Sequence, residues 1–280
     1  FLLIPVVLLA CYEGGAVMLY GRGLLTDAGV YASSYRAQQG PGLAEITVIT
    51  LSFTGGCLFT ALCYSPLLWR MRTLTAGVAL LVLTLMGLPL LHTLGRFSLH
   101  DPSGVRWVSV SQIALFVAAG VNVLGVAIAE HWRRRTAETL FLFLWIAGTF
   151  IFAGFLNWTV NGRSVLPMVP AVGIVLMLRL DRGSAGTDRP EVSWRLLLPL
   201  VPAVLIALLV TRADSLLADS ARNAAATIHR DFKGNPGSLW FQGHWGFQYY
   251  MESLGEKPFD VHRSRLAPGD RVVVPANNSF

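Results

Sequence analysis

A short polar segment between two apolar runs holds the residues whose types and spacing are best suited to chemistry. It extends from Asn157 to Arg163, and the next apolar run carries Pro167 and Pro170 in its first turns, where a missing N–H costs least. Arg163 is permanently charged, and its planar guanidinium can hold a phosphate through two parallel hydrogen bonds. We take Arg163, with Asn157 and Asn161, as candidate substrate-binding residues. The alternative is an interfacial arginine that extends to lipid headgroups.

A second candidate lies near the carboxyl end, where His244 and Trp245 stand between Gly243 and Gly246. Flanking glycines allow the backbone to approach a ligand closely. A histidine among aromatic residues can stack on a sugar ring and hydrogen-bond its hydroxyl groups, so His244 and Trp245 are candidate substrate-binding residues. The alternative is an ordinary helix start, with a buried stripe at helical spacing formed by Phe247, Tyr250, Met251 and Leu254.

Glu13 is the single carboxylate within the apolar runs as we delimit them below. A charged side chain inside a membrane span is costly and therefore suggests a function, so Glu13 joins the candidate substrate-binding residues. In the alternative, Glu13 lies near the membrane interface and pairs with Arg22.

The sequence contains no pattern that indicates a metal site or a cofactor. Its six histidines show neither H-x-x-H nor H-E-x-x-H spacing. Its three cysteines fit no zinc pattern, and we expect them to be packing residues. A divalent metal held by an acidic loop upstream of Phe1 remains open.

The composition places these candidates in a membrane protein. Of 280 residues, 54% are hydrophobic and 14% are charged, whereas soluble domains carry about 25% charged residues. The charges cluster between apolar runs that match the ~30 Å hydrocarbon core, and a chain in lipid must pair its backbone groups within each helix. The net charge of +6 comes mostly from arginines in the connections, so we expect no nucleic-acid partner.

The runs predict an all-α polytopic membrane protein with about seven transmembrane helices over residues 1–211. A small α/β tail is expected over residues 212–280, with a helix over Arg212–Arg230, strands at Leu239–Phe241 and Arg271–Val274, and a helix over His244–Leu254. We also expect a short interfacial helix within Tyr20–Glu45. The predicted spans are Phe1–Leu19, Ile46–Leu68, Leu74–Leu91, Val108–Ala129, Thr139–Leu156, Ser164–Leu180 and Leu196–Val210.

Arginines distinguish the two sides of the predicted membrane domain. Alternate connections carry nine arginines against five, and the richer set should face the cytoplasm. The tail then lies outside. The richer set is Arg70, Arg72, Arg133, Arg134, Arg135, Arg179, Arg182, Arg189 and Arg195, and the poorer set is Arg22, Arg36, Arg96, Arg106 and Arg163. Tryptophans, which prefer the membrane interface, mark predicted span ends at Trp69, Trp107, Trp132, Trp158 and Trp194.

The segment at Arg163 also resembles a known family. Arg163, Leu166, Pro167 and Pro170 match the R-Y-L-L-P-x-x-P segment in the later spans of family-39-type membrane glycosyltransferases, with serine and valine in place of the tyrosine and first leucine. These are relatives of dolichyl-phosphate-mannose protein mannosyltransferases and aminoarabinose transferases. The stretch from Trp240 to Tyr250 is similar to the extracytoplasmic end of bacterial members.

The resemblance implies a GT-C-like fold in the bacterial inner membrane. It implies transfer of a sugar from a polyprenyl-phosphate carrier to an acceptor on the extracytoplasmic face, with that carrier and membrane lipid as partners. The family's general base is an acidic residue in the first outside loop. Because this chain opens on Phe1 inside an apolar run, we expect it to be a carboxyl-terminal portion whose catalytic residue lies upstream; Asp27 lies in the wrong loop.

Two other classes remain as alternatives. A transporter or channel should carry ionisable residues deep in its spans, or broken helices in repeated halves. A non-catalytic membrane subunit or sensor would use its tail to bind a partner, and its full-length form would transfer no sugar.

Overall fold

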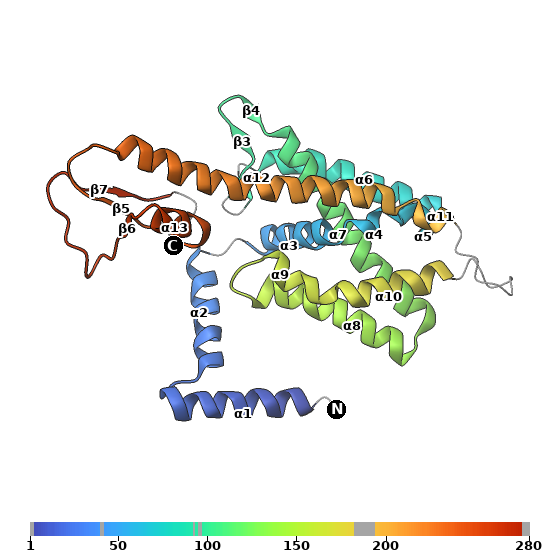
Figure 1. Cartoon of the computed structure of the whole chain (residues 1–280). Helices are drawn as coiled ribbons and strands as arrows, with labels where there is room; N and C mark the ends of the chain where they lie inside the picture. Colours follow the sequence, from blue (N-terminus) through green and yellow to red (C-terminus); the bar gives the residue numbers. More distant parts are fainter. Residues whose placement is uncertain (1–2, 40–41, 92, 95–96, 182–193, 276–280) are drawn as a thin grey trace. The chain divides into compact units, whose positions relative to one another are not determined.

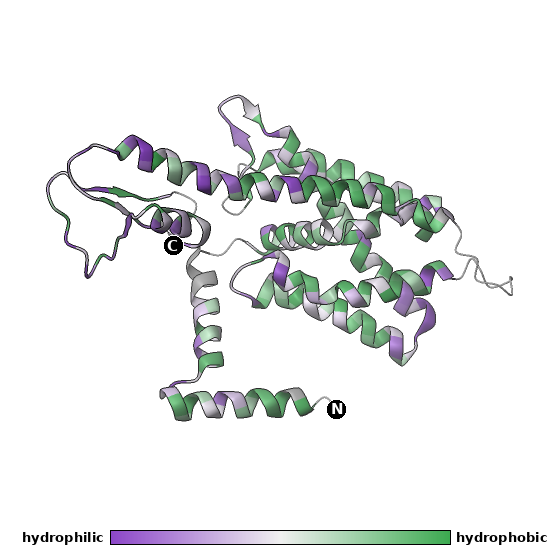
Figure 2. Ribbon diagram, in the orientation of Figure 1, coloured by the Kyte–Doolittle hydropathy of each residue, from purple (hydrophilic) through white to green (hydrophobic). Residues whose placement is uncertain are grey.

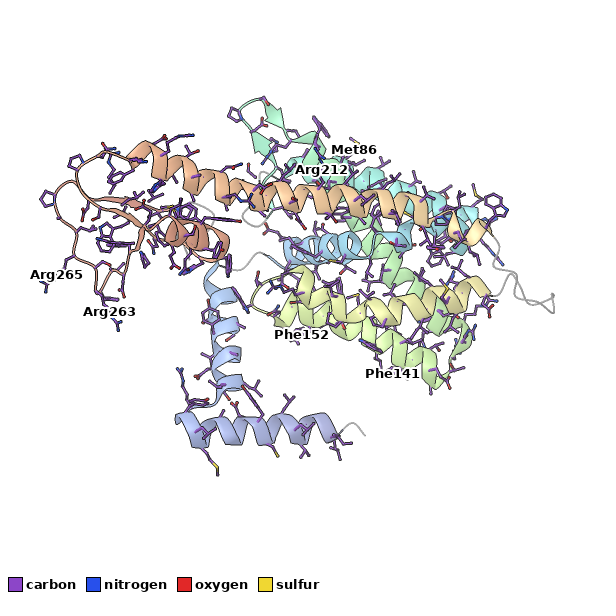
Figure 3. All side chains as sticks on the ribbon, in the orientation of Figure 1. Met86, Phe141, Phe152, Arg212, Arg263 and Arg265 are labelled. Atoms are coloured by element: carbon purple, nitrogen blue, oxygen red, sulfur yellow. The ribbon has the colours of Figure 1, made fainter. Side chains whose placement is uncertain are left out.

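The computed structural model describes residues 3–39, 42–91, 93–94, 97–181 and 194–275 (Figure 1). The chain forms two compact units, Phe1–Ala203 and Val204–Phe280, and each is described here by itself. The division falls inside a single long helix, ahead of the boundary expected after residue 211; Arg212, labelled in Figure 3, lies within that helix. Among the predicted arginines, Arg96, Arg182 and Arg189 lie outside the described residues, as do the side chains of Arg36 and Arg195.

Five described helices are long and apolar enough to cross a membrane, which identifies an integral membrane protein. Apolar residues cover these helices, including the first part of the last one (Figure 2). α6 (Met71–Gly87) has no fully buried residue, which suits a helix with much of its surface toward lipid. The five are α6 with its 3-10 extension η1 (Leu88–Leu90), α7 (Trp107–Arg134), α8 (Ala137–Ile151) with the π-turn η2 (Phe152–Leu156), the segment α9 (Gly162–Val165), η3 (Leu166–Met168) and α10 (Val169–Leu180), and α12 (Leu200–Phe232).

The first two predicted spans form shorter apolar helices. α1 (Leu3–Tyr20) covers the first of them. The second breaks into α3 (Leu43–Cys57), α4 (Thr60–Cys63) and α5 (Ser65–Leu68). Pro66 stands at the start of α5, where it lacks the N–H that a continuous helix requires. α2 (Leu24–Gln39) is the helix expected before the second span, and a four-residue helix, α11 (Trp194–Leu197), precedes α12.

Close backbone contact joins α3 to α7. A Cβ on Gly55 would overlap the carbonyl oxygen of Phe116, and a Cβ on Gly120 would overlap that of Leu51. Small residues allow this approach in membrane proteins, where helix association depends on packing. α7, with α4, α5, α8 and α10, surrounds the main core, whose largest fully buried members are Ile146, Met168 and Val165.

Two small antiparallel hairpins fill the connection before α7, where the sequence predicted only a loop. They pair β1 (Thr93–Leu94) with β2 (Phe97–Ser98), and β3 (His100–Asp101) with β4 (Gly104–Val105). Hydrogen bonds from the side chain and backbone of Ser103 lower the pKa of Asp101 and fix the second turn. The buried side chains of Leu94 and Leu99 join a second core with Leu88, Val110 and Ala114.

The second unit contains α12 from Val204 onward, together with a small α/β module. β5 (Leu239–Phe241), β6 (Lys257–Pro258) and β7 (Arg271–Val273) form a parallel sheet in the order β6-β5-β7, and α13 (Trp245–Ser253) connects β5 to β6. The predicted strands and helix are thereby confirmed, whereas β6 was missed. The core of the module consists of Ala225, Leu239, Phe241, Phe247 and Met251.

Candidate functional site

A cavity of about 520 Å³ opens where α8 ends and α9 begins. It brings together Asn161 and Arg163, two of the predicted site residues. Phe152, labelled in Figure 3, forms part of its apolar wall. The remaining lining residues are Gly148, Thr149, Ser164 and Pro167.

Ser164 ties the two predicted asparagines into one polar loop. Asn161 is the N-cap of α9, and its Oδ1 accepts hydrogen bonds from the Ser164 backbone N–H at 3.0 Å and the Ser164 hydroxyl at 3.1 Å. Asn157 donates to the Ser164 Oγ at 2.7 Å and to the Thr159 carbonyl oxygen at 2.9 Å. Asn157 therefore positions the loop, and it is not among the residues that line the cavity.

The helix end that forms the cavity wall departs from regular α geometry. α8 finishes in the π-turn η2, and the Asn157 N–H donates to the Phe152 carbonyl oxygen at 2.8 Å. Gly154 lets this turn approach α3, because a Cβ there would lie 2.5 Å from the Thr50 Oγ1. Single π-turns of this kind occur frequently at functional sites, because they redirect side chains at a helix end.

Arg163 supplies the positive charge of the cavity. Its side chain is exposed, and it forms no ion pair with any carboxylate of the described residues. The described residues contain no group of three or more histidines, cysteines or carboxylates able to hold a metal ion. A permanent cation beside an apolar wall and the Asn161 amide is suited to an anionic group attached to an apolar chain.

Glu13 forms hydrogen bonds to the start of α2. Its carboxylate accepts hydrogen bonds from the backbone N–H groups of Leu25 and Thr26, at 2.8 and 3.0 Å, and from the Thr26 hydroxyl. It thus caps the first turn of α2. The expected partner Arg22 instead lies 3.6 Å from Asp27, so the proposed Glu13–Arg22 pair is wrong. Glu13 is also not among the lining residues of the cavity.

His244 and Trp245 lie in the second unit, where His244 is the N-cap of α13 and Trp245 is its first residue. The rings lie 6.4 Å apart at a tilted angle, and 82% of Trp245 is exposed. Trp245 has a φ of 55°, an uncommon backbone conformation for a residue other than glycine. Phe247 and Met251 are buried as the helix-start alternative expected. Neither residue is among the lining residues of the cavity, so this pair is a second candidate site.

Sequence reasoning missed a buried carboxylate near the end of α7. Glu130 is 1% exposed and directly follows Ala129, where the predicted span ended. The Arg134 Nε donates to it at 2.7 Å, and another Arg134 nitrogen donates to the Leu178 carbonyl oxygen at 3.2 Å. The i, i+4 spacing of Glu130 and Arg134 was the available signal.

Asn122 is the second polar residue that the sequence reasoning missed. Its Oδ1 accepts hydrogen bonds from the Trp69 indole at 2.7 Å and the Ser65 hydroxyl at 3.1 Å, and its Nδ2 donates to the Ala61 carbonyl oxygen at 3.0 Å. A lone asparagine within an apolar run was the signal, since buried polar groups in a membrane need partners.

Contacts between connections show which helix ends lie together. The Arg179 guanidinium lies 4.2 Å from the Trp69 ring centroid and donates to the Leu68 carbonyl oxygen. The hydrogen bond from Arg134 to the Leu178 carbonyl oxygen joins a third connection to these two. The described arginine-rich connections therefore lie at one end of the bundle. Tyr31 and Trp158, whose ring centroids lie 5.9 Å apart, join α2 to the segment that follows α8. The cavity therefore lies at the end of α8 away from the arginine-rich connections.

No family model matches the chain, and no curated protein or solved structure matches it either.

Proposed function

We propose that this chain is a portion of an integral membrane glycosyltransferase that transfers a sugar from a polyprenyl-phosphate carrier to an acceptor on the extracytoplasmic face. The observation that carries the proposal is the cavity at Arg163, where a permanent cation, the Asn161 amide and an apolar wall line one space. Its volume of about 520 Å³ is within the usual range for small-molecule sites.

The cavity residues suggest how the donor would bind. The Arg163 guanidinium would hold the carrier's phosphate bidentately, and the apolar wall at Phe152 would face the isoprenoid chain. In the transfer, the acceptor oxygen attacks the anomeric carbon, the bond to the phosphate oxygen breaks, and the acceptor proton passes to a base. Arg163 would stabilise the negative charge that develops on the departing phosphate. We assign the base to no residue of this chain.

The proposal includes an orientation and a location. We place the arginine-rich connections in the cytoplasm of a bacterium and the cavity and tail on the extracytoplasmic side of the inner membrane. α1 and the α3–α5 segment would complete seven crossings in a GT-C-like arrangement. His244 and Trp245 would then face the same compartment as Arg163, where the aromatic ring would stack on a sugar.

Sugar transfer by the full-length protein from a polyprenyl-phosphate donor tests the proposal. We expect Arg163→Ala to abolish most transfer and Arg163→Lys to restore only part of it, because an ammonium keeps the charge but not the two parallel hydrogen bonds. Arg133→Ala, which removes an exposed arginine in the last turn of α7, is the control and should transfer normally. Normal transfer by Arg163→Ala would refute the role of the cavity.

A second candidate function is a non-catalytic membrane subunit whose tail binds a partner. Trp245 and Tyr249, one helical turn apart on α13, are 82% and 67% exposed, which gives the module an aromatic surface. A full-length protein that transfers no sugar, and whose complex is lost in Trp245→Ala, would establish this function instead. A transporter finds less support, because the buried Glu130 lies in the last turns of α7 and pairs with Arg134.

A further inference from the structure

A second cavity lies between α6 and α7, apart from the site at Arg163. It has a volume of about 470 Å³, and most of its surface is apolar. α6 and α7 pack side by side and both belong to the described membrane-crossing helices (Figure 1). We call this cavity the α6–α7 groove. Its lining includes Trp69, Ala76, Gly77, Leu81, Leu115 and Asn122.

Small residues keep the groove open, and hydrogen bonds fix one of its walls. A Cβ added at Gly77 would meet no atom within 4 Å, and one at Gly125 would be 3.6 Å from the Trp69 ring. The Trp69 indole is itself held by its 2.7 Å hydrogen bond to Asn122. The groove is therefore open beside Gly77 and bounded on one side by the fixed Trp69 ring. A ligand can occupy the space at Gly77 without moving a neighbouring side chain.

The dimensions of the groove match one leaflet of a bilayer. The lining extends from Thr73 to Leu81 along α6, about 12 Å at the rise of an α-helix, and from Leu115 to Gly125 along α7, about 15 Å. The hydrocarbon core of a bilayer is about 30 Å thick. A groove of half that depth suits one acyl chain of a lipid that enters from the nearer surface.

Positive charge stands at one end of the groove. Arg70 and Arg72 lie in the short stretch between the lining residues Trp69 and Thr73, and both side chains are exposed. Neither forms an ion pair with a carboxylate of the described residues. Arginines at this depth attract a lipid phosphate, and an anionic headgroup is favoured over a zwitterionic one because its charge is not cancelled.

We propose that the α6–α7 groove binds one acyl chain of an anionic phospholipid whose phosphate pairs with Arg70 and Arg72. This site is separate from the cavity at Arg163, which lies at the other end of the bundle. The proposal does not depend on sugar transfer, since it rests on the groove, its open glycine and its two arginines.

Native mass spectrometry of the full chain in a non-ionic detergent tests the proposal. Phosphatidylglycerol and phosphatidylcholine with identical acyl chains are added at equal concentration. We expect the wild-type protein to retain one phosphatidylglycerol in preference to phosphatidylcholine. Gly77→Phe should lose this lipid because the ring fills the groove. Arg70→Gln combined with Arg72→Gln should weaken phosphatidylglycerol retention about thirtyfold and abolish the preference.

The matched control is Gly173→Phe in α10. Gly173 is exposed, a Cβ there would also meet no atom within 4 Å, and it is not among the lining residues of the groove. This variant should retain the lipid as the wild type does. If Gly77→Phe does not yield folded protein, Ala76→Leu obstructs the same groove by a smaller change.

Several outcomes would overturn the proposal. One is retention by the groove-filling variant equal to that of the wild type. Another is that the wild type retains the two phospholipids equally and that the arginine substitutions do not change this retention. A polyprenyl phosphate that displaces phosphatidylglycerol at equal concentration would assign the groove to a different lipid. A loss of dimer mass in Gly77→Phe, without loss of lipid, would assign it to a second copy of the chain.

Discussion

Replacing Asn122 with alanine would remove three hydrogen bonds that join α7 to α4 and α5. The Trp69 indole, the Ser65 hydroxyl and the Ala61 carbonyl oxygen would each lose a partner at 2.7 to 3.1 Å. Interhelical hydrogen bonds in membrane proteins contribute on average about 0.6 kcal/mol, and a buried donor left unpaired costs about 1–3 kcal/mol. We therefore expect Asn122→Ala to lower the free energy of unfolding by about 2–4 kcal/mol.

Reversible unfolding of the full chain in mixed micelles, followed by tryptophan fluorescence, measures this change. Ser65→Ala removes one of the three bonds and should cost about 0.6 kcal/mol, and the double variant should cost less than the sum, because the two residues share a bond. A free energy for Asn122→Ala within about 0.5 kcal/mol of the wild type would refute the reasoning, since surface substitutions without lost partners give changes of that size.

Two further predictions follow from close contacts and from the tail. Gly120→Leu should destabilise the bundle by at least about 1–3 kcal/mol, because its side chain must displace the Leu51 backbone; Gly173→Leu, in open space, is the control in the same unfolding assay. Asp270 accepts backbone hydrogen bonds from Ala267 and Ser238, with smaller contributions from the Trp240 indole and Lys257, and these lower its pKa. The ionised Asp270 side chain therefore stabilises the fold at neutral pH. This stabilisation is lost as the pH falls below about 4, the ordinary pKa of an aspartate, and then through the lower pKa of Asp270 in the folded state. Hydrogen exchange at β5 and β7 should accelerate over that range in the wild type, and an Asp270→Asn variant that keeps the same pH dependence would contradict this assignment.

Local patterns predicted much of the fold. The five long helices follow from apolar runs, since an isolated backbone in lipid must satisfy its own hydrogen bonds. Tryptophans at Trp69, Trp107 and Trp194 lie at helix ends as expected. In the tail, β5, α13 and β7 follow from short-range periodicity. β6 escaped detection because it is two residues long and includes Pro258.

The candidate site was predicted in part. Asn161 and Arg163 share a cavity because they are neighbours in one loop, which the sequence already indicates. The linking role of Ser164 depends on the N-cap geometry at Asn161 and was not anticipated. The hydrogen bonds of Glu13 were not predicted, because its partners at Leu25 and Thr26 become adjacent only when the chain turns between α1 and α2.

The sequence by itself determined that this is a membrane protein, where most of its helices lie and which connections are rich in arginine, because these properties depend on composition over a single helix length. Only the tertiary structure decided which residues meet. The Asn122 bonds to Ser65 and Trp69 join positions 57 and 53 residues apart, and the α6–α7 groove exists because two helices with small side chains face each other. Such contacts depend on how helices pack, and packing depends on the shapes of side chains from distant segments together.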